Sequence, residues 1–531
     1  MKRLSCILVL TGFLIVPGSS CSSGGDDGPD FLTLFLLFNF LQSQACGTVS
    51  DPLFGQQWHL SNTGQRGGVS GEDARVASVW NSGVCGAGIS MSVIDDGLAI
   101  AHEDLSPNIE AGLSYDYTTG GTDPSSSSAN HGTSVGGIMA ARSNTIGVRG
   151  AAPLASLRGY NYLANATAGN EADAMTRGVA GLHISNNSWG PTDLTGSLQS
   201  STSTWRAAID TGLSSGRSGL GTLYFWAAGN GGAGETDNSN YDGYANYHGV
   251  IAICAVGQDG KRASYSEQGA NLWVCAHSQG NDSVAISTTD NIGGLGYNAS
   301  GASGNFTDNN YTNTFNGTSA ASPLAAGVGA LVLQANPALS YRDVRLILAQ
   351  SARKNDAADA DWTTNAAGLN INHKYGFGTV DALAAVNLAR GWVNVAAQKT
   401  FTPPTNSPSS AIPDNNATGI TGTINVSGSG ITSIEFVEIN LTFTHAYYRD
   451  LTMTLTSPSG TASTLMSTGV CRNPNTLAVV ACSPTGSQTV RFGVARTLGE
   501  SADGNWTLRL ADGAASDTGT FTSWSMKLYG R

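Results

Sequence analysis

Charged residues are scarce in this sequence, and their balance excludes some functions. Lys, Arg, Asp and Glu together make up 12% of the 531 residues, and the acids outnumber the bases by 38 to 26. The net charge of −12 provides no basic surface for nucleic acid, but it could attract cationic peptides or metal ions. A chain of this length is expected to form two or more domains with a large core.

The apolar run Phe31–Leu41 is too short for a membrane span, which needs about 20 apolar residues. It could lie on a membrane, dock on the protein or belong to a pro-segment. Upstream of it, Lys2 and Arg3 precede an apolar stretch and small residues ending at Cys21, as in a secretory signal.

We therefore predict a signal peptide over residues 1–21 and a linker with an unassigned apolar segment over residues 22–45. The signal is equally compatible with a bacterial lipoprotein signal, in which Cys21 carries a lipid anchor. The expected location is outside a bacterial cell, either secreted or held at the cell surface or outer membrane as a lipoprotein.

Cysteine is sparse, and none of the eight has the spacing of metal ligands, so zinc is not expected. Two of them fall in the predicted signal, and the other six are an even number in an exported chain, which favours disulfides. Pairing of neighbours is the simplest arrangement: Cys46–Cys85, Cys254–Cys275 and Cys471–Cys482.

From about residue 46 to residue 395, short β-branched runs alternate with helical stretches of small residues. We predict strands in "GISMSVIDDG", "TLYFWAAGNGG" and "VIAICAVGQDG" and a helix in "HGTSVGGIMAARS". This alternation predicts an α/β domain whose parallel sheet has helices on both faces and functional residues at the carboxyl ends of its strands.

A second domain is predicted over residues 396–531. Its first part, residues 400–419, is rich in Pro, Ser and Asn and predicts a linker. Beyond it, apolar and polar residues alternate with a period of two in "RDLTMTLTSPSG", "GNWTLRLADG" and "TSWSMKLYG". This pattern predicts an all-β jelly roll or sandwich.

Three polar residues of the first domain combine into a candidate reaction centre. Asp95 follows the first predicted strand, His131 opens "HGTSVGG" and Ser319 lies in "NGTSAASP". Each alone has a structural interpretation as a turn cap, a loop residue or a helix cap. Together they are the nucleophile, base and carboxylate of a serine hydrolase, because a serine needs a base and the imidazole needs a carboxylate. The order Asp–His–Ser is that of subtilisin, and Ser319 lacks the G-x-S-x-G motif of esterases.

These motifs resemble the subtilisin-type serine proteases, and the kexin and furin branch most closely. The resemblance covers roughly residues 51–390 and includes "DPLFGQQWHL", "NNSWGPTD", "YDGYANY" and "HKYGFGTVDA". It implies a serine endopeptidase in which Asn230 is the side-chain donor of the oxyanion hole, worth about 3–4 kcal/mol of barrier reduction. We also expect Gly317 to permit close approach of the backbone, and Pro323 to fit the first turn of the helix that carries Ser319.

The resemblance also implies cleavage after basic residues. Asp193 and Asp242 match the carboxylates that hold the arginine before the cut, and Asp96 matches the residue that favours a second basic residue upstream. Further acids of furin have no counterpart, since Ser128, Thr176 and Gln199 fall near their positions. We therefore expect a monobasic or dibasic preference.

The resemblance implies two calcium sites, and hard oxygen ligands from separate segments suit Ca²⁺, which takes about 6–8 of them. The first comprises the side chains of Asp51, Asp104 and Asn144 and the carbonyl groups of Arg142, Ile146 and Val148. The second comprises Asp193, Asp237 and Glu267 and supports the arginine pocket.

The second domain resembles the P domain of kexin-like enzymes, which implies that it stabilises the protease domain; a surface-binding module is the alternative. The stretch between Cys21 and Cys46 is too short for the family's prodomain. A separate chaperone or inhibitor protein is therefore expected, unless the P domain and calcium suffice. Two other functions stay open, a subtilisin-type protease of broad specificity and an inactive, calcium-stabilised surface-binding protein.

Overall fold

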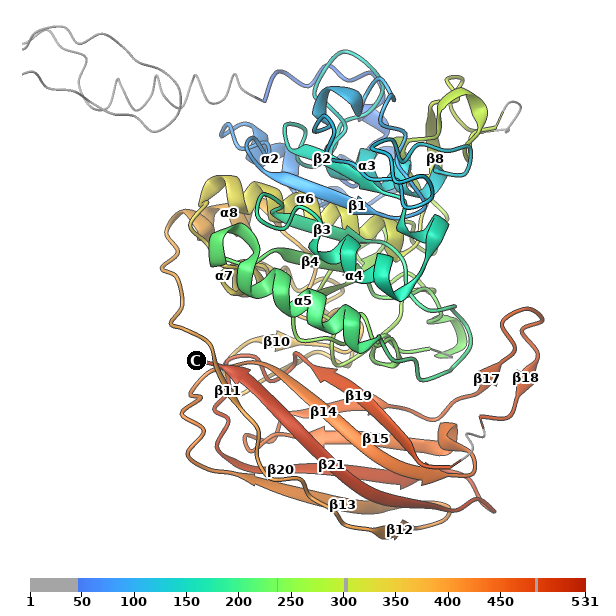
Figure 1. Ribbon diagram of the computed structural model, residues 1–531, viewed down its shortest axis with the longest axis vertical. Coiled ribbons are helices and arrows are strands. Elements are labelled where there is room, and N and C mark those ends of the chain that lie inside the picture. The colour runs from blue at the N-terminus through green and yellow to red at the C-terminus, as the bar shows by residue number, and fades with distance from the viewer. Residues whose placement is uncertain (1–45, 236, 300–303, 483–485) are drawn as a thin grey trace, which may run out of the picture.

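A computed structural model describes residues 46–235, 237–299, 304–482 and 486–531. The predicted signal peptide, Cys21 and the run Phe31–Leu41 lie outside the described residues. The described chain forms an α/β part followed by an all-β part, as predicted (Figure 1).

The first part is built on a six-stranded parallel sheet in the order β2-β1-β3-β4-β5-β6. Nearly every strand residue is buried, as expected for a parallel sheet covered on both faces. The predicted strands are confirmed. The strands are β1 (Ser90–Ile94), β2 (Ser156–Tyr160), β3 (Ile184–Asn187), β4 (Leu223–Ala227), β5 (Val250–Val256) and β6 (Val274–His277).

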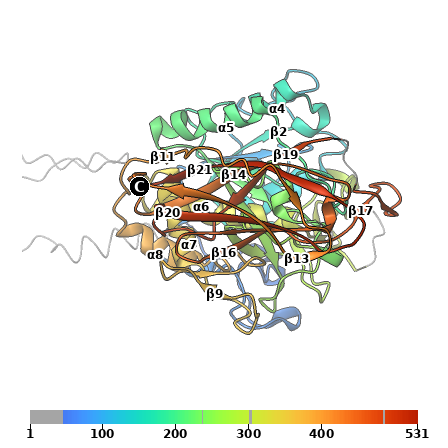
Figure 2. The same ribbon diagram turned by 90° about the horizontal axis from the view of Figure 1, so that it is seen from below.

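Helices cover both faces of this sheet. Helices α4 and α5 pack together on one face, and α6 packs against β3 to β6 on the other face beside α3 and α8 (Figures 1 and 2). The helices are α2 (Val76–Trp80), α3 (Asn130–Ala140), α4 (Ala168–Thr176), α5 (Ser203–Ser215), α6 (Thr318–Ala335), α7 (Tyr341–Ser351) and α8 (Ala382–Arg390). Of the described helices, only α6 is long and apolar enough for a membrane span, and it is buried in the core.

Pro323 lies in the second turn of α6, so its expected place in the first turn is wrong. Proline has no N–H, and the carbonyl four residues earlier, that of Ser319, therefore loses its helical partner. The hydroxyl of Ser188, which follows β3, donates to this carbonyl at 3.1 Å. The helix thus continues through the proline, and a side chain from the sheet satisfies the freed carbonyl.

The second part is a β-sandwich of two antiparallel sheets, β11-β21-β14-β19 and β13-β20-β15-β16, with β12 paired to β21. Its central strand β15 alternates buried and half-buried residues as the sequence predicts. The strands are β11 (Lys399–Phe401), β12 (Ser410–Ile412), β13 (Asn416–Val426), β14 (Ile434–His445), β15 (Leu451–Thr456), β16 (Ala462–Met466), β19 (Gln488–Val494), β20 (Gly504–Asp512) and β21 (Gly519–Gly530).

The predicted linker over residues 400–419 contains structure. Strand β12 and parts of β11 and β13 fall inside it, and β11 and β12 both pair with β21 at the edge of a sheet. Edge positions tolerate the prolines of this stretch because an edge strand leaves some of its N–H groups unpaired.

Three short antiparallel pairs lie outside the main sheets. They are β7 (Ile286–Thr289) with β8 (Tyr311–Phe315), β9 (Thr363–Thr364) with β10 (Asn370–Ile371), and β17 (Cys471–Arg472) with β18 (Val479–Val480). The disulfides are the three neighbour pairs that the sequence predicts, Cys46–Cys85, Cys254–Cys275 and Cys471–Cys482.

The two parts are joined by a buried polar interface. Arg342 of α7 forms a two-point ion pair with Glu435 of β14, at 2.7 and 2.5 Å. Asn240 and Gly493 exchange two hydrogen bonds, at 2.9 and 2.7 Å. The ring of Tyr529 stacks on His248 with the ring centres 4.1 Å apart. The β-sandwich is therefore docked on the α/β part through specific contacts.

Candidate active site

A cavity of about 350 Å³ opens where β1, β3 and β4 end. Polar residues from several separate segments of the chain line it. Nine of the residues predicted for catalysis, specificity or calcium line this one cavity: Asp95, Asp96, His131, Asp193, Asn230, Asp237, Asp242, Glu267 and Ser319. The carboxyl ends of parallel strands meet here, which explains why residues so far apart in the sequence converge.

His131 and Asp95 are directly hydrogen-bonded, with 2.9 Å between the imidazole Nδ1 and the carboxylate Oδ1. The ring of Phe315 packs edge-on against the imidazole, at 5.3 Å between centres. Burial lowers the pKa of His131, but the attraction and hydrogen bond of Asp95 and the charge of Asp96 outweigh it, so the pKa is raised above 6.5 overall. Asp95 thus orients the ring and favours its protonated form.

Asp96 holds the first turn of α3, which carries His131. Its carboxylate accepts the backbone N–H groups of His131 and Gly132, at 3.1 and 2.8 Å. Burial, together with the neighbouring charge of Asp95, raises the pKa of Asp96 to about 7. Asp96, predicted to contact substrate, therefore lines the cavity and also caps a helix.

Ser319 is the second residue of α6, where its backbone N–H has no helical acceptor. Its hydroxyl donates to the carbonyl oxygen of Ser188 at 3.1 Å. Among the described residues, this hydroxyl therefore bonds Ser188 and not the His131 ring, although Ser319 and His131 line the same cavity. Sequence analysis missed Ser188, and its place before Trp189 in "NNSWGP" was the available signal.

The side chain of Asn230 is fixed by Thr318, the residue before Ser319. Its Oδ1 accepts the backbone N–H and the hydroxyl of Thr318, at 2.8 and 3.0 Å. The amide Nδ2 is thereby directed to the other side, where it lies 3.5 Å from Asp193 Oδ2. Gly317 has φ +80°, and a Cβ there would lie 3.2 Å from Asn230 Oδ1, so glycine permits this approach. Thr318 is a second residue that sequence analysis missed.

Asp193 and Asp242 form an acidic end of the cavity. Burial raises the pKa of Asp242 to about 7 and also raises that of Asp193, and each carboxylate accepts a backbone N–H, from Tyr244 and Asn230 respectively. A Cβ on Gly190 would lie 3.2 Å from Asp242 Oδ2, so this glycine leaves the carboxylate accessible from the cavity. A buried acid, Asp242, and a half-buried one, Asp193, at a cavity end suit the guanidinium group of an arginine.

Asp237 and Glu267 lie beside Asp193. Burial is the main cause that raises the pKa of all three carboxyl groups, and the charges of Asp193 and Asp237 add to the rise at Glu267. Besides burial, backbone N–H donors and the Asn230 amide lower these pKa values, and neighbouring carboxylates raise those of Asp237 and Glu267. A hard divalent cation fits this donor set, since it would neutralise the mutual repulsion.

The residues of the other predicted calcium site lie together outside the cavity. Asn144 donates its backbone N–H to Asp51 Oδ1 at 2.9 Å and its side-chain amide to Asp104 Oδ1 at 2.8 Å. Asp104 also accepts the backbone N–H of Val148, at 2.9 Å. Burial raises the pKa of Asp104 to about 7. Burial also raises the pKa of Asp51, and the charge and hydrogen bond of Arg149 offset only part of that rise.

The loop between Arg142 and Val148 encloses this group. The backbone N–H of Arg142 donates to the Asp104 carbonyl at 2.8 Å, and that of Ile146 donates to Asn144 Oδ1 at 2.6 Å. Within the described ranges, no three His, Cys, Asp or Glu side chains form a metal site by themselves. A calcium ion at either place would therefore need amide or backbone carbonyl oxygens as well.

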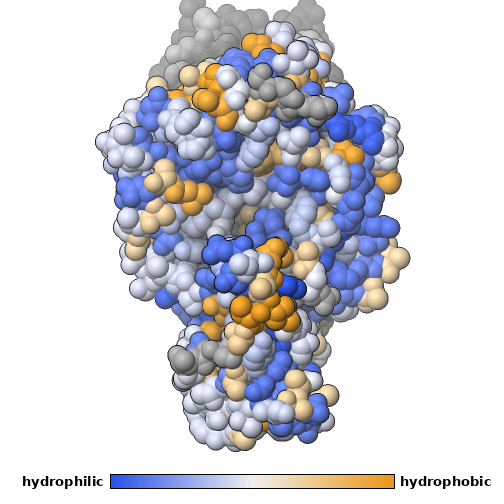
Figure 3. Space-filling view, turned by 90° about the vertical axis from the view of Figure 1, so that its right-hand side faces the viewer, coloured by the Kyte–Doolittle hydropathy of each residue, from blue (hydrophilic) through white to orange (hydrophobic). Residues whose placement is uncertain are grey.

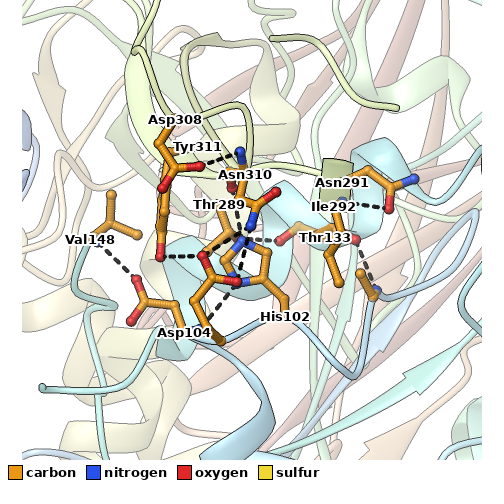
Figure 4. A network of polar contacts seen from close by, with 12 residues as sticks. His102, Asp104, Thr133, Val148, Thr289, Asn291, Ile292, Asp308, Asn310 and Tyr311 are labelled. Carbon is orange, nitrogen blue, oxygen red and sulfur yellow. Dashed lines mark hydrogen bonds and ion pairs between the residues drawn. The ribbon is translucent and has the colours of Figure 1, made fainter. Parts of the chain in front are cut away.

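A polar network links this region to α3 (Figure 4). His102 Nε2 bonds the Asn310 carbonyl at 2.8 Å, and the hydroxyl of Tyr311 donates to Glu103 at 3.0 Å. Thr289 Oγ1 donates to the Thr133 carbonyl in α3 at 2.7 Å. The β7–β8 hairpin thus ties the Asp104 loop to the helix that presents His131.

A serine, an imidazole, a carboxylate and an amide around one cavity at the ends of a parallel sheet are typical of serine hydrolases. Two family signatures match the sequence, the Subtilase family over residues 86–378 and the Proprotein convertase P-domain over residues 434–528.

Relatives match along most of the chain. Neuroendocrine convertase 2 of Homo sapiens is 32% identical over 499 residues, which are 91% of this chain and 74% of that protein. Protease KEX1 of Kluyveromyces lactis is 32% identical over 490 residues, 91% of this chain and 61% of that protein.

Solved structures of a serine protease are similar to this chain in fold. The serine protease of Aeromonas sobria is 27% identical with a TM-score of 0.81, covering 97% of this chain and 100% of that one. The same protease in its complex with the chaperone ORF2 is 28% identical with a TM-score of 0.80, and the match covers 91% of this chain and 95% of that one. The chain belongs to the subtilase family and is a serine endopeptidase that carries the P domain of the proprotein convertases.

Proposed function

We propose that this endopeptidase cleaves peptide bonds after arginine or lysine, by nucleophilic attack of Ser319 with His131 as general base. The observation that carries the proposal is the shared cavity, which the Ser319, His131 and Asn230 side chains line together with the acids Asp193 and Asp242. Similarity to Neuroendocrine convertase 2 and Protease KEX1 supports the basic preference.

The reaction begins when substrate binds and the Ser319 hydroxyl turns from the Ser188 carbonyl toward the imidazole. His131 takes the proton as the serine oxygen attacks the scissile carbonyl, and Asp95 stabilises the imidazolium. The oxyanion accepts hydrogen bonds from Asn230 Nδ2 and the backbone N–H of Ser319. His131 then protonates the leaving amine, and water releases the acyl group by the reverse route.

Specificity comes from the acidic end of the cavity. The guanidinium of the arginine before the cut pairs with the half-buried Asp193 and the buried Asp242. Asp96 lies on the other side of the cavity beside Asp95 and favours a second basic residue upstream.

Calcium, when bound, supplies charge neutralisation to the buried carboxylates. Asp193, Asp237 and Glu267 would hold one ion, and Asp51, Asp104 and Asn144 with carbonyl groups of residues 142–148 another. The six paired cysteines favour an oxidising, extracytoplasmic location. Because the related Aeromonas sobria protease forms a complex with a chaperone, a separate folding partner is also proposed for this chain.

Peptides that differ only in the residue before the cut test the specificity. Arginine and lysine peptides are expected to be cleaved at least about a hundredfold faster, in kcat/KM, than leucine or phenylalanine peptides, since leaving one partner of a buried charge pair without its counter-charge costs about 2–5 kcal/mol. Asp242→Asn should remove this advantage and leave the slow leucine cleavage unchanged, whereas Asp193→Asn should lower both rates, because Asp193 also accepts from Asn230 and is a proposed calcium ligand. Equal cleavage of arginine and leucine peptides by the unaltered protein would favour a broad-specificity subtilisin.

A further inference from the structure

We propose that a hairpin of the P domain is a second contact site for the substrate and takes an extended apolar stretch near the cleaved bond. The hairpin consists of residues 471–482 and is called the P hairpin below. This inference rests on the proposed function, since it adds a contact to the same substrate.

The P hairpin projects from the sandwich. Its strands β17 and β18 pair with each other in a two-stranded sheet of their own, and Cys471–Cys482 closes it at the base. Figure 1 shows it extending away from both sandwich sheets beside the α/β part. The disulfide limits its conformations, so binding there orders few additional residues.

The base of the P hairpin is bonded to the loop after β3. The backbone N–H of Arg472 donates to the Thr195 carbonyl at 2.9 Å, and the hydroxyl of Tyr448 donates to the Gly196 carbonyl at 3.3 Å. Gly196 has φ +65°, and a Cβ there would overlap the Val470 carbonyl oxygen, so only glycine permits this contact.

The same loop lines the acidic cavity. Asp193, Thr195, Ser197 and Gln199 all line it, and Asp237, also a lining residue, accepts the backbone N–H groups of Thr195 and Gly196. One short loop therefore has the cavity on one side and the P hairpin on the other. Only this loop therefore separates a polypeptide held at the acidic cavity from the base of the P hairpin.

The P hairpin exposes apolar side chains. Leu477, Val479 and Val480 are 46%, 58% and 40% exposed, and they are the only exposed large apolar side chains among the described residues of 396–531. Figure 3 looks onto this side of the molecule and shows an orange patch at the centre of the face, bordered by blue. Leu477 lies between the two strands, and Val479 and Val480 form β18 beside Arg472 and Cys471, so apolar side chains are exposed along the P hairpin, which indicates a contact surface.

The chemistry of the occupant follows from the size of this patch. The area that three side chains can bury is far less than the about 800 Å² per partner that stable protein–protein interfaces bury. A substrate already held by its basic residue needs no such area, because tethering raises its effective concentration at the P hairpin. The occupant is therefore an extended substrate segment with apolar side chains, not a second copy of the chain or a separate folded protein.

The test compares long and short substrates of the whole protein. All peptides share one arginine cleavage site. A short peptide ends near that site, and longer peptides of about 20 residues carry a Leu-Val-Ile or a Ser-Asn-Ser run at stepped distances on either side. The variant Leu477→Ser/Val479→Thr/Val480→Thr changes the P hairpin, and Leu383→Ser/Val393→Thr is the matched control with exposed apolar residues elsewhere.

The unaltered protein and the control should prefer an apolar over a polar run by about tenfold in kcat/KM, mainly through KM, at one range of distances. The P hairpin variant should lose this preference and cleave the short peptide at the normal rate. An unaltered preference in the variant, or none in the normal protein, overturns the inference. The inference is also overturned if the P hairpin variant differs from the normal protein only in self-association or in the yield of folded enzyme. Failure of the normal protein to cleave the short arginine peptide would instead refute the proposed function.

Discussion

Ser188 and Ser319 are joined by two hydrogen bonds that run in opposite directions, each 3.1 Å long. The Ser319 hydroxyl donates to the Ser188 carbonyl, and the Ser188 hydroxyl donates to the Ser319 carbonyl that Pro323 leaves without a helical partner. The end of strand β3 and the start of helix α6 are thereby held together at the proposed nucleophile.

Replacing Ser188 with alanine should leave the Ser319 carbonyl unsatisfied, at a cost of about 1–3 kcal/mol in the free energy of unfolding. The displaced nucleophile should also lower kcat more than it raises KM, which steady-state kinetics and urea unfolding would measure. Ser322→Ala is the matched control, since this buried serine lies in the same helix and bonds Asn186 at 2.8 Å. It should lose stability without a comparable loss of kcat, and equal kinetic effects of both variants would refute the positioning role of Ser188.

The rate should depend on pH through His131. Proton transfer from Ser319 requires the neutral imidazole, and the pKa of His131 is raised above 6.5 because the effects of Asp95 and Asp96 outweigh that of burial. On lowering the pH, kcat/KM should therefore fall through a pKa above 6.5. Asp96→Asn removes one negative charge and should shift this acid limb to lower pH by up to about one unit. If the acid limb of the pH profile of kcat/KM does not move in Asp96→Asn, then Asp96 does not act on the imidazole.

Calcium should stabilise the protein measurably. A hundredfold excess over the dissociation constant of one site adds about 2.7 kcal/mol, which raises the Tm of a chain of this size by roughly 3 °C. Scanning calorimetry with calcium and with a chelator would measure this shift. Asp237→Asn and Asp104→Asn should each reduce it, whereas Asp414→Asn, at an exposed acid of the sandwich, should not. Identical melting with and without calcium would exclude both sites.

The ion pair between Arg342 and Glu435 should be essential for docking of the sandwich. Both side chains are buried, so Glu435→Gln leaves the Arg342 charge without its carboxylate, at a cost of about 3–5 kcal/mol. Arg342→Met should cost less, because Arg531 also pairs with Glu435, at 3.2 Å. The double variant Arg342→Met/Glu435→Met should recover much of the loss, because it removes both charges. Urea unfolding measures the free energy of unfolding of all three variants. A loss in the double variant equal to the sum of the two single losses would contradict a specific pair.

The sequence predicted those features that depend on local pattern. The alternation in Leu451–Thr456 identified a half-buried strand, and the residues after β1 and β4 identified cavity residues, since strand ends converge in a parallel sheet. Contacts between distant segments were not predictable. Strands β11 and β12 depend on pairing with β21, and the roles of Ser188 and Thr318 depend on the orientation of α6. Pro323 was misplaced because a helix can contain a proline when another group satisfies the freed carbonyl.

Covalent labelling of the purified protein tests the proposed nucleophile most directly. A fluorophosphonate that carries an arginine-like group should modify Ser319 alone, as located by peptide mass spectrometry, and should abolish cleavage of an arginine peptide in proportion to labelling. Ser319→Ala should be folded, unlabelled and inactive, whereas Ser322→Ala should still be labelled at Ser319. Cleavage by Ser319→Ala at the normal rate, or full labelling at another residue, would contradict the account.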